Sequence, residues 1–323
     1  MAIDITDHDR LLVKAARLYY EQGLTQAQIS KRLRLSRQKI QRLLKTARDE
    51  GIVQINIRPI MGIIPELETA LEERFGLQEV VIVETTSFED QDTVAREVGA
   101  GAAEYILRLL QPEDSIVISW GGTLRGMVNS LSAIAHRNKF DGIKVIQGLG
   151  GLGNPNSETH AADLTRRLAR ILDGQAVLLP APGIAGSQSA QVAFRSDPYV
   201  IQAMELAARA DLAIFGIGAP RKDSILIQQG NIITWPELAA LADRGAVGDI
   251  NLRYFDSLGQ PVKSDLDDRV VGLTLKDIRG IKYVVGIAGG SAKFKAIKAA
   301  LEGKLVDVLV TDHITAQSLL ENP

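Results

Sequence analysis

The sequence predicts an α/β protein of two domains: an N-terminal winged helix-turn-helix domain and a larger, Rossmann-like α/β domain built on a parallel sheet. Its 323 residues exceed the roughly 250–300 at which one hydrophobic core stops growing. Basic residues gather near the N-terminus, and apolar runs alternate with amphipathic helical runs through the rest. We expect a first domain over 1–58, a linker and connecting helix over 59–76, and a second domain over 77–323.

The composition excludes several classes of protein. Hydrophobic residues make up 46% and charged residues 24%, which is typical of a folded globular chain rather than a disordered one. The absence of cysteine excludes disulfides, cysteine nucleophiles and cysteine zinc sites, and four scattered histidines predict no metal site or other cofactor. The acidic start resembles no secretory signal, and no apolar run reaches 18 residues. We therefore expect a cytoplasmic protein that does not enter membranes.

The net charge of −2 conceals an asymmetry between the two ends of the chain. Residues 1–58 hold 12 Lys and Arg against 6 Asp and Glu, a net of +6, and the remainder has a net of −8. Residues 31–48 contain eight basic side chains and no acidic one. Such a division is typical of a nucleic-acid-binding end. Charge alone is equally compatible with a solvated basic helix face.

The first helix is predicted to run from Asp7 or Asp9, either of which is a favourable N-cap, to about Gln22. Gly23 then ends it, because glycine readily adopts the left-handed conformation that closes a helix. The apolar face of this helix, at i, i+3/i+4 spacing, comprises Leu11, Leu12, Ala15, Leu18 and Tyr19.

Two further capped helices complete the predicted helix-turn-helix. Thr25 caps a short helix over 26–33, and Ser36 caps a third helix over 37–49. The turn between them places Arg34 where the motif usually has glycine, since that position has a positive φ. A residue other than glycine costs roughly 1 kcal/mol there.

The third helix is predicted to be two-sided, with Ile40, Leu43, Leu44 and Ala47 on its apolar face. Arg reads guanine and Gln reads adenine in the major groove, whereas lysines at the rim bind phosphates. We expect base contacts from Arg37, Gln38 and Gln41, with the role of Arg42 left open. Thr25, Lys39 and Lys45 are expected to contact phosphates, and Ser36 is a further DNA-binding residue. A basic helical hairpin without DNA is the alternative.

After Gly51, residues 52–57 alternate apolar and polar side chains, which predicts a strand and hence a wing. Pro59 and Pro65 interrupt regular structure and mark the linker. A helix is predicted over 66–75. It either forms part of the tether between the domains, makes a dimer contact, or packs on its own domain.

The second domain is predicted as a parallel sheet covered by helices on both faces. The expected strands lie near 80–83, 115–119, 143–146, 176–179, 212–217, 283–288 and 306–310. The expected helices lie near 91–110, 124–135, 160–172, 198–208, 236–242, 293–301 and 313–320. Ligands of such open sheets bind beyond the carboxyl ends of the strands.

Two glycine pairs at strand ends predict a site for a phosphorylated ligand. Gly121 and Gly122 follow a strand and precede Thr123 at a helix start, where free N–H groups bind anions. Glycines at such turns are common, so this motif is weak by itself. A second motif, Gly289-Gly290-Ser-Ala-Lys293, repeats the pattern and adds a cation.

Two polar residues are candidates for binding ligand hydroxyls. His160 lies at a helix start after the loop 148–153, and Asp249 lies in the run 245–250. A surface histidine and a turn-capping aspartate are their simpler roles. Asp312 is most simply the N-cap of the last helix.

The chain resembles the SorC-type sugar-binding transcriptional regulators over essentially its whole length. The most specific segments are GLTQAQISKRLRLSRQKIQRLL near the N-terminus, LLPAP at 178–182, GAVGDINLRYFDSLGQPV at 245–262 and VVGIAGGSAKFKAIKAALEGKLVDVLVTD at 284–312. The resemblance implies an effector domain similar to the sugar-phosphate isomerase and CoA-transferase-like fold. It also implies a homodimer or homotetramer whose operator affinity a phosphorylated sugar alters.

Carried over by position, the resemblance places Gly121, Gly122, Thr123 and Lys293 around the phosphate, with His160 and Asp249 near the sugar hydroxyls. Some relatives carry a second hydroxyl residue at position 124 and a cation at position 149, where this chain has Leu124 and Leu149. The effector therefore cannot be copied from them. The implied function is a DNA-binding regulator, most simply a repressor, of a carbohydrate or polyol operon. The alternative is an enzyme similar to a sugar-phosphate isomerase with a helical extension.

Overall fold

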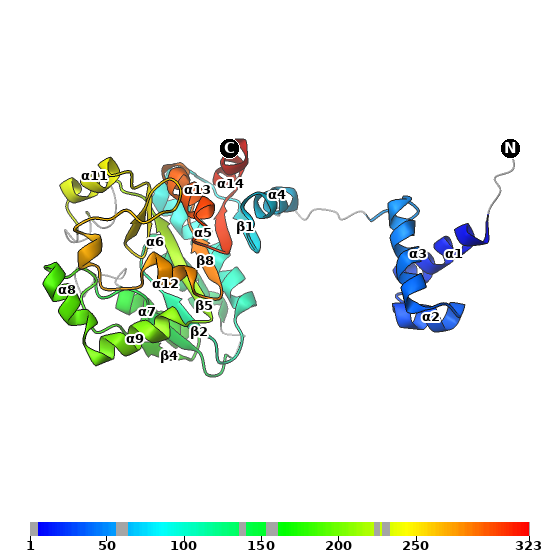
Figure 1. Ribbon diagram of the computed structural model, residues 1–323, viewed down its shortest axis with the longest axis horizontal. Helices are drawn as coiled ribbons and strands as arrows, with labels where there is room; N and C mark the ends of the chain where they lie inside the picture. The colour runs from blue at the N-terminus through cyan, green and yellow to red at the C-terminus, as the bar shows by residue number, and fades with distance from the viewer. Residues whose placement is uncertain are drawn as a thin grey trace. The chain divides into compact units, whose positions relative to one another are not determined.

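The computed structural model describes residues 6–55, 64–135, 140–152, 161–222, 227 and 233–322. The chain forms two compact units, residues 1–60 and 61–323 (Figure 1). Below, the first is called the head and the second the effector domain. Among the described residues, no helix is both long enough and apolar enough to cross a membrane.

The head begins with helix α1, Asp7–Ala16, which continues into a π-helical turn at Arg17–Glu21. Its N-cap is Thr6 rather than Asp7 or Asp9, because the Thr6 hydroxyl accepts from Asp9 N and the Asp9 carboxylate accepts from Thr6 N. The prediction that Tyr19 lies on the apolar face was also wrong: Tyr19 is 37% exposed. The wider π turn rotates this residue away from the core.

Helices α2, Gln26–Leu33, and α3, Arg37–Asp49, form the expected helix-turn-helix. Thr25 and Ser36 are their N-caps, as predicted, and each hydroxyl accepts a backbone N–H of the first turn. Arg34 adopts the left-handed conformation, with φ 55° and ψ 41°. The core of the head is built from Leu12, Ala15, Ala16, Leu18, Ile29, Ile40, Leu43, Leu44 and Ala47.

The predicted wing is not present in the described part of the head. Residues 52–55 form no strand, and positions 56 and 57 lie outside the described residues. Val53 N instead donates to Ala47 O, so the chain folds back on the end of α3. Alternating apolar residues form a strand only against a partner strand, and the described residues of the head include none.

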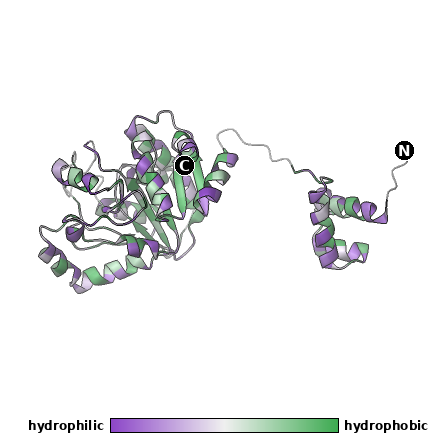
Figure 2. Ribbon diagram, turned by 45° about the horizontal axis from the view of Figure 1, so that its top comes forward, coloured by the Kyte–Doolittle hydropathy of each residue, from purple (hydrophilic) through white to green (hydrophobic). Residues whose placement is uncertain are grey.

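Seven parallel strands form the sheet of the effector domain, in the order β1-β9-β8-β5-β2-β3-β4. All seven coincide with predicted strands, with their ends shifted by at most two residues. Their bounds are β1 Glu79–Val83, β2 Ser115–Ile118, β3 Lys144–Gln147, β4 Gln175–Val177, β5 Leu212–Gly218, β8 Val284–Ile287 and β9 Val308–Asp312. Figure 2 shows these central strands as mainly hydrophobic, as expected for a sheet buried on both faces.

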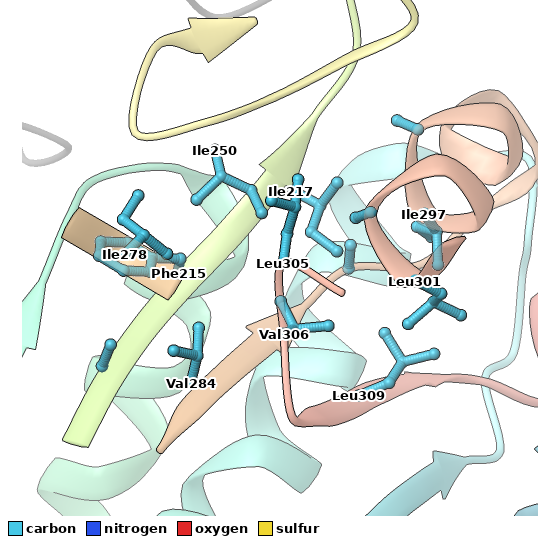
Figure 3. Close-up of a cluster of buried hydrophobic side chains, with 14 of the residues drawn as sticks. Phe215, Ile217, Ile250, Ile278, Val284, Ile297, Leu301, Leu305, Val306 and Leu309 are labelled. Atoms are coloured by element: carbon cyan, nitrogen blue, oxygen red, sulfur yellow. The ribbon is translucent and has the colours of Figure 1, made fainter. Parts of the chain in front are cut away.

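Helices cover both faces of the sheet. Those against one face are α5 Gln91–Leu109, α6 Gly122–Ile134 and α7 Ala161–Ile171, whose side chains share a core cluster with Ile116, Ile214 and Val285. Those against the other face are α4 Pro65–Phe75, α12 Leu275–Arg279, α13 Phe294–Glu302 and α14 His313–Glu321. Figure 3 shows part of this second cluster, in which Phe215 and Ile217 of β5 share the core with Val284 of β8, and Ile297 and Leu301 of α13 lie above Leu309 of β9.

Periodicity did not predict every element. The structure adds the antiparallel hairpin of β6, Gly248–Ile250, and β7, Arg253–Phe255, which extends from β5. It also adds α8, Gln188–Arg195, and the short α12. The predicted helices over 198–208 and 236–242 correspond to α9, Pro198–Ala208, and α11, Trp235–Asp243.

The order of the strands determines where a ligand can bind. Neighbouring strands β2 and β5 are followed by connections in opposite directions: the chain continues from β2 to β3 on one side, and from β5 towards β8 on the other. A crevice therefore opens beyond the carboxyl ends of β2 and β5.

Candidate functional site

The exposed side of α3 is an uncompensated cationic surface. Ile40, Leu43, Leu44 and Ala47 are buried, whereas the other face of α3 points to water. Every predicted DNA-contacting residue is exposed: Thr25, Ser36, Arg37, Gln38, Lys39, Gln41, Arg42 and Lys45. In the part of the chain that the structure describes, none of the four basic ones forms an ion pair. The helix therefore presents free charges at the spacing that the major groove accepts.

A pocket of about 190 Å³ lies beyond β2 and β5, where the connections from these strands diverge. It joins five of the predicted effector-binding residues, namely Gly121, Gly122, Thr123, Asp249 and Lys293. Its other lining residues are Gln91, Asp92, Ala95, Ser119, Trp120, Leu124, Gly216, Ile217, Gly218, Ala219, Arg221 and Asn251.

One wall of the pocket is the open N-terminus of α6. Gly121 has φ 129° and ψ 162°, a conformation that side-chain-bearing residues rarely adopt, and it directs the chain from β2 into the helix. No side chain caps α6, so the N–H groups of its first turn keep no partner within the helix. Free N–H groups and the positive end of the helix dipole suit an anion.

The position of this helix end is set by close packing of α5 on α6. A Cβ at Gly99 would lie 2.7 Å from Met127 N, and one at Gly126 would lie 2.8 Å from Ala95 O. Both distances are too short for a real Cβ. The two helices therefore approach at glycines, which holds the α6 N-terminus rigidly beside the first turn of α5.

Asp249 lies opposite, on β6. It pairs with Gly218 of β5, where any Cβ would overlap the Asp249 carboxylate. The carboxylate is buried and accepts a backbone hydrogen bond from Leu252 N at 3.2 Å. Burial raises the pKa of Asp249 to about 6, against the opposing effects of the Leu252 hydrogen bond and of Lys293. An acceptor kept out of water in this way suits ligand hydroxyls.

The turn after Asp249 connects three parts of the site. Asn251 and Leu252 have φ of 57° and 60°, the signature of a tight hairpin turn. Asn251 Oδ1 accepts from Ser119 Oγ at 2.8 Å, and Asn251 Nδ2 donates to Gly148 O at 3.0 Å. One amide thus ties the hairpin to the ends of β2 and β3.

Lys293 supplies a cation at the end of the 3₁₀ turn Ser291–Lys293. Burial lowers the pKa of Lys293 and Arg221 lowers it further, whereas Asp249 raises it. No hydrogen bond of Lys293 Nζ to any described residue is found. The charge of Arg221 near Lys293 adds to the positive potential of this side of the pocket, which favours an anionic ligand.

Gln91, at the start of α5, offers a donor that the sequence did not indicate. Its side-chain Nε2 is buried and has no partner among the described residues, and it lies over Gly290, where a Cβ would overlap it. A buried amide nitrogen without a partner is costly, and Gln91 is also among the residues that line the pocket.

Comparison with known proteins places this geometry in a family. The family "Putative sugar-binding domain" matches residues 63–321. The sorbitol operon regulator of Klebsiella pneumoniae is 31% identical over 98% of this chain and 99% of its own length. The crystal structure of that full-length regulator, SorC, covers 98% of this chain and 100% of its own with a TM-score of 0.73. The chain belongs to the SorC-type sugar-binding transcriptional regulators. The deoxyribonucleoside regulator of Bacillus subtilis is also similar, at 29% identity over 98% of this chain and 99% of its own.

Not all predicted residues of this SorC-type regulator meet in the pocket. Gly289 and Gly290 are not among its lining residues, because Gly290 N donates to Asp312 Oδ2 at 2.7 Å and to Thr315 Oγ1 at 3.1 Å. The second glycine pair thus anchors the Lys293 turn rather than facing the ligand space. Asp312 is the predicted N-cap of α14. His160 lies outside the described residues.

The sequence did not single out Gln91, Asp92, Ser119, Arg221 and Asn251, which also line the pocket of this SorC-type regulator. Asn251 had a usable signal, since asparagine tolerates the left-handed turn of a hairpin. Gln91 had none, because only the packing of α5 on the Gly290 turn places it there. Within the described residues, no group of three His, Asp or Glu side chains is arranged to hold a metal ion.

Proposed function

We propose that this cytoplasmic regulator represses a carbohydrate or polyol catabolic operon, and that a phosphorylated sugar or polyol bound in the pocket changes its affinity for operator DNA. The main support for the proposal is that one pocket combines the uncapped N-terminus of α6, Lys293 and the buried carboxylate of Asp249. The first two suit a phosphate and the third suits hydroxyls. One relative is named a sorbitol operon regulator and another a deoxyribonucleoside regulator, and the polyol and the sugar-containing compound in these names support the class of ligand.

In the proposed arrangement, the ligand phosphate binds the N–H groups of Gly122 and Thr123 and the Lys293 ammonium. The hydroxyl groups then bind Asp249, with Gln91 as a further donor. No residue is assigned to catalysis. We propose that the pocket binds its ligand without converting it, in keeping with the relatives' names as transcriptional regulators.

The proposed DNA reader is α3. Arg37, Gln38 and Gln41 on its exposed face contact bases, and Thr25, Ser36, Lys39 and Lys45 contact phosphates, with Arg42 between the two groups. Since each head reads one half-site, the proposal includes a homodimer or homotetramer.

The ligand assignment is tested with the full chain and a panel of pentose, hexose and hexitol monophosphates, each paired with its unphosphorylated form. Both tryptophans lie in the effector domain, and Trp120 lines the pocket, so tryptophan fluorescence reports binding. Lys293→Ala should weaken the best phosphorylated ligand by about 10- to 100-fold, the loss of one charge-assisted contact. The unphosphorylated analogue should change little.

Lys295→Ala is the matched control, because Lys295 is exposed two residues further along the same chain segment. Equal losses for phosphorylated and unphosphorylated compounds would remove Lys293 from the phosphate role. Recovery of a chemically altered ligand after incubation would favour the enzyme alternative.

The DNA assignment is tested by the salt dependence of binding to operator DNA. Lys45→Ala should reduce the slope of log K against log salt by about 0.9, as expected for one phosphate contact. Arg37→Ala should instead change the preferred base at one position. Lys14, an exposed cation on α1, provides the control Lys14→Ala. Unchanged slope and base preference in both α3 variants would contradict the assignment.

A further inference from the structure

The hairpin that carries Asp249 is too small to keep its shape by itself. Strands β6 and β7 contain three residues each, and β6 pairs with β5 through Asp249 and Ile250. An isolated two-stranded hairpin is marginally stable at best in water. Contacts outside the hairpin must therefore fix its turn, and these contacts determine where the Asp249 carboxylate lies in the pocket.

The turn itself is linked directly to Asp249. It consists of Asn251 and Leu252, and Leu252 N donates to Asp249 Oδ2 at 3.2 Å. Asn251 holds one side of the turn, through its hydrogen bonds with Ser119 Oγ and Gly148 O. A displacement of the turn would therefore displace the Asp249 carboxylate as well.

Arg253, the residue directly after the turn, attaches the hairpin to residues 267–273, which we call the anchor segment. Its side chain is 6% exposed, and all five of its N–H groups point to acceptors of this segment. Nε donates to Leu273 O at 3.1 Å, Nη1 to Asp267 O at 2.9 Å and Asp267 Oδ1 at 2.7 Å, and Nη2 to Val270 O and Gly272 O, both at 3.2 Å.

The anchor segment is in turn bound to the chain that follows β3. Leu273 N donates to Gly148 O at 3.1 Å, and Gly150 N donates to Val271 O at 3.0 Å. Gly148 O also accepts from Asn251 Nδ2. The hairpin turn, the anchor segment and the end of β3 thus form one hydrogen-bonded unit, and Arg253 supplies most of the bonds between its first two parts.

Only an arginine has the donor geometry that this arrangement uses. A buried charge is costly, and the acceptors here include one carboxylate and four neutral carbonyls. Val270, Gly272 and Leu273 are buried, so their carbonyls would lose their partner without the guanidinium. A lysine offers three donors from a single point, whereas arginine offers five in a planar fork.

We infer that Arg253 is a positioning residue of the ligand site: it holds the β6–β7 turn so that the Asp249 carboxylate is presented to ligand hydroxyls. Arg253 is not among the residues that line the pocket, so it acts through Asp249. The inference rests on the proposed function for the role of Asp249, and it adds the residue that keeps Asp249 in place.

The first test needs no ligand. Arg253→Lys keeps the charge but loses the fork, and the titration of Asp249 reports whether the carboxylate is still buried. The pKa of Asp249 is raised by burial and affected by the charge of Lys293, not by that of Arg253, so a change in its titration reports position. Urea unfolding at pH 4.5 and pH 7 measures it, with each protein compared with its own Asp249→Asn derivative.

In the wild type, the Asp249→Asn substitution should change the difference in stability between the two pH values. In Arg253→Lys it should change this difference little, because a released Asp249 reaches water and its pKa returns towards the ordinary value. A merely structural loss would instead lower the stability equally at both pH values and leave the titration of Asp249 intact.

The second test separates the hydroxyl end of the pocket from its phosphate end. Arg253→Lys should weaken the best monophosphate of the panel by about 10-fold, as expected for the loss of contacts to one misplaced carboxylate. Inorganic phosphate, which in the proposed arrangement binds Gly122, Thr123 and Lys293, should bind as it does to the wild type. Tryptophan fluorescence measures both, because Trp120 lines the pocket.

Arg279→Lys is the matched control. The Arg279 guanidinium also donates to backbone carbonyls, Gly259 O at 2.8 Å and Gly303 O at 3.2 Å, but away from the turn. This variant should change neither the titration of Asp249 nor ligand binding. If Arg253→Lys does not fold, Asp267→Ala decides the matter: it removes one of the five acceptors and should give a smaller loss of the same kind.

Two results would overturn the inference. One is a titration of Asp249 that persists unchanged in Arg253→Lys or, where that variant is unfolded, in Asp267→Ala. The other is an equal loss of inorganic phosphate and of the monophosphate, which would indicate a general collapse of the pocket. A wild type that binds no compound of the panel would instead contradict the proposed function, and the titration of Asp249 would still decide whether Arg253 holds the turn.

Discussion

Asp249 shows how much of the site depends on the environment of one residue. The carboxylate is buried beside Gly218, and burial raises its pKa to about 6, whereas its ordinary value is 3.8. The folded state therefore binds the proton more tightly than the unfolded state. Protonation stabilises the fold, and this stabilisation is lost as pH rises through the folded pKa.

We expect the free energy of unfolding of the effector domain to fall between about pH 4 and pH 6 from this residue, by at most about 3 kcal/mol, and then to level off. Asp249→Asn should remove that contribution. Urea unfolding followed by tryptophan fluorescence at pH 4.5 and pH 7 measures it, because both tryptophans lie in the effector domain. The exposed pocket residue Asp92, changed to Asn, is the control. A wild-type minus Asp249→Asn difference that is the same at both pH values would contradict the assignment.

At the scale of elements, the turn between α2 and α3 contains a residue type that its backbone conformation disfavours. Arg34 occupies a left-handed position with φ 55° that glycine normally fills. The caps on either side compensate: Thr25 forms a capping box with Gln28, and Ser36 accepts from Lys39 N at 3.2 Å. The motif therefore forms without its usual glycine.

Arg34→Gly should stabilise the head by about 1 kcal/mol by relieving this strain. Arg34→Ala is the matched control, because it removes the same charge but keeps a Cβ at positive φ, and it should give no gain. Hydrogen exchange of α3 amides in the full chain, followed by mass spectrometry, measures both. Equal protection in the two variants would show that charge, not strain, governs the turn.

Removal of the N-cap of α3 should instead destabilise the head. Ser36→Ala removes the acceptor for Lys39 N and should destabilise the head by about 1 kcal/mol. The same exchange experiment measures it as faster exchange in the first turn of α3. Unchanged exchange would mean that the cap does not stabilise the helix.

At the scale of the whole molecule, the proposed function is a coupling between two units that each fold around their own core. Linkage requires that operator DNA change the affinity for ligand by the same factor by which ligand changes the affinity for DNA. Typical couplings amount to about 5- to 150-fold.

We expect the best sugar or polyol phosphate from the panel to bind with an affinity that differs by such a factor in the presence of saturating operator. Isothermal titration of the ligand, with and without the DNA, measures it. Lys293→Ala should weaken the ligand in both titrations and leave DNA binding itself intact. Identical ligand affinities with and without DNA would reject the coupling.

The sequence by itself determined the parts of this protein that depend on local pattern. Seven strands, both caps of the helix-turn-helix and the glycine turn before α6 follow from apolar periodicity, capping residues and conformational preference, which act over a few neighbouring residues. Only the tertiary structure decided the rest. The strand order places Lys293 and Asp249 near the end of β2. Packing directs Gly290 N to the Asp312 carboxylate, and the position of α5 places Gln91 in the pocket lining. These outcomes depend on contacts between residues far apart in the chain, and such contacts leave no periodic trace in the sequence.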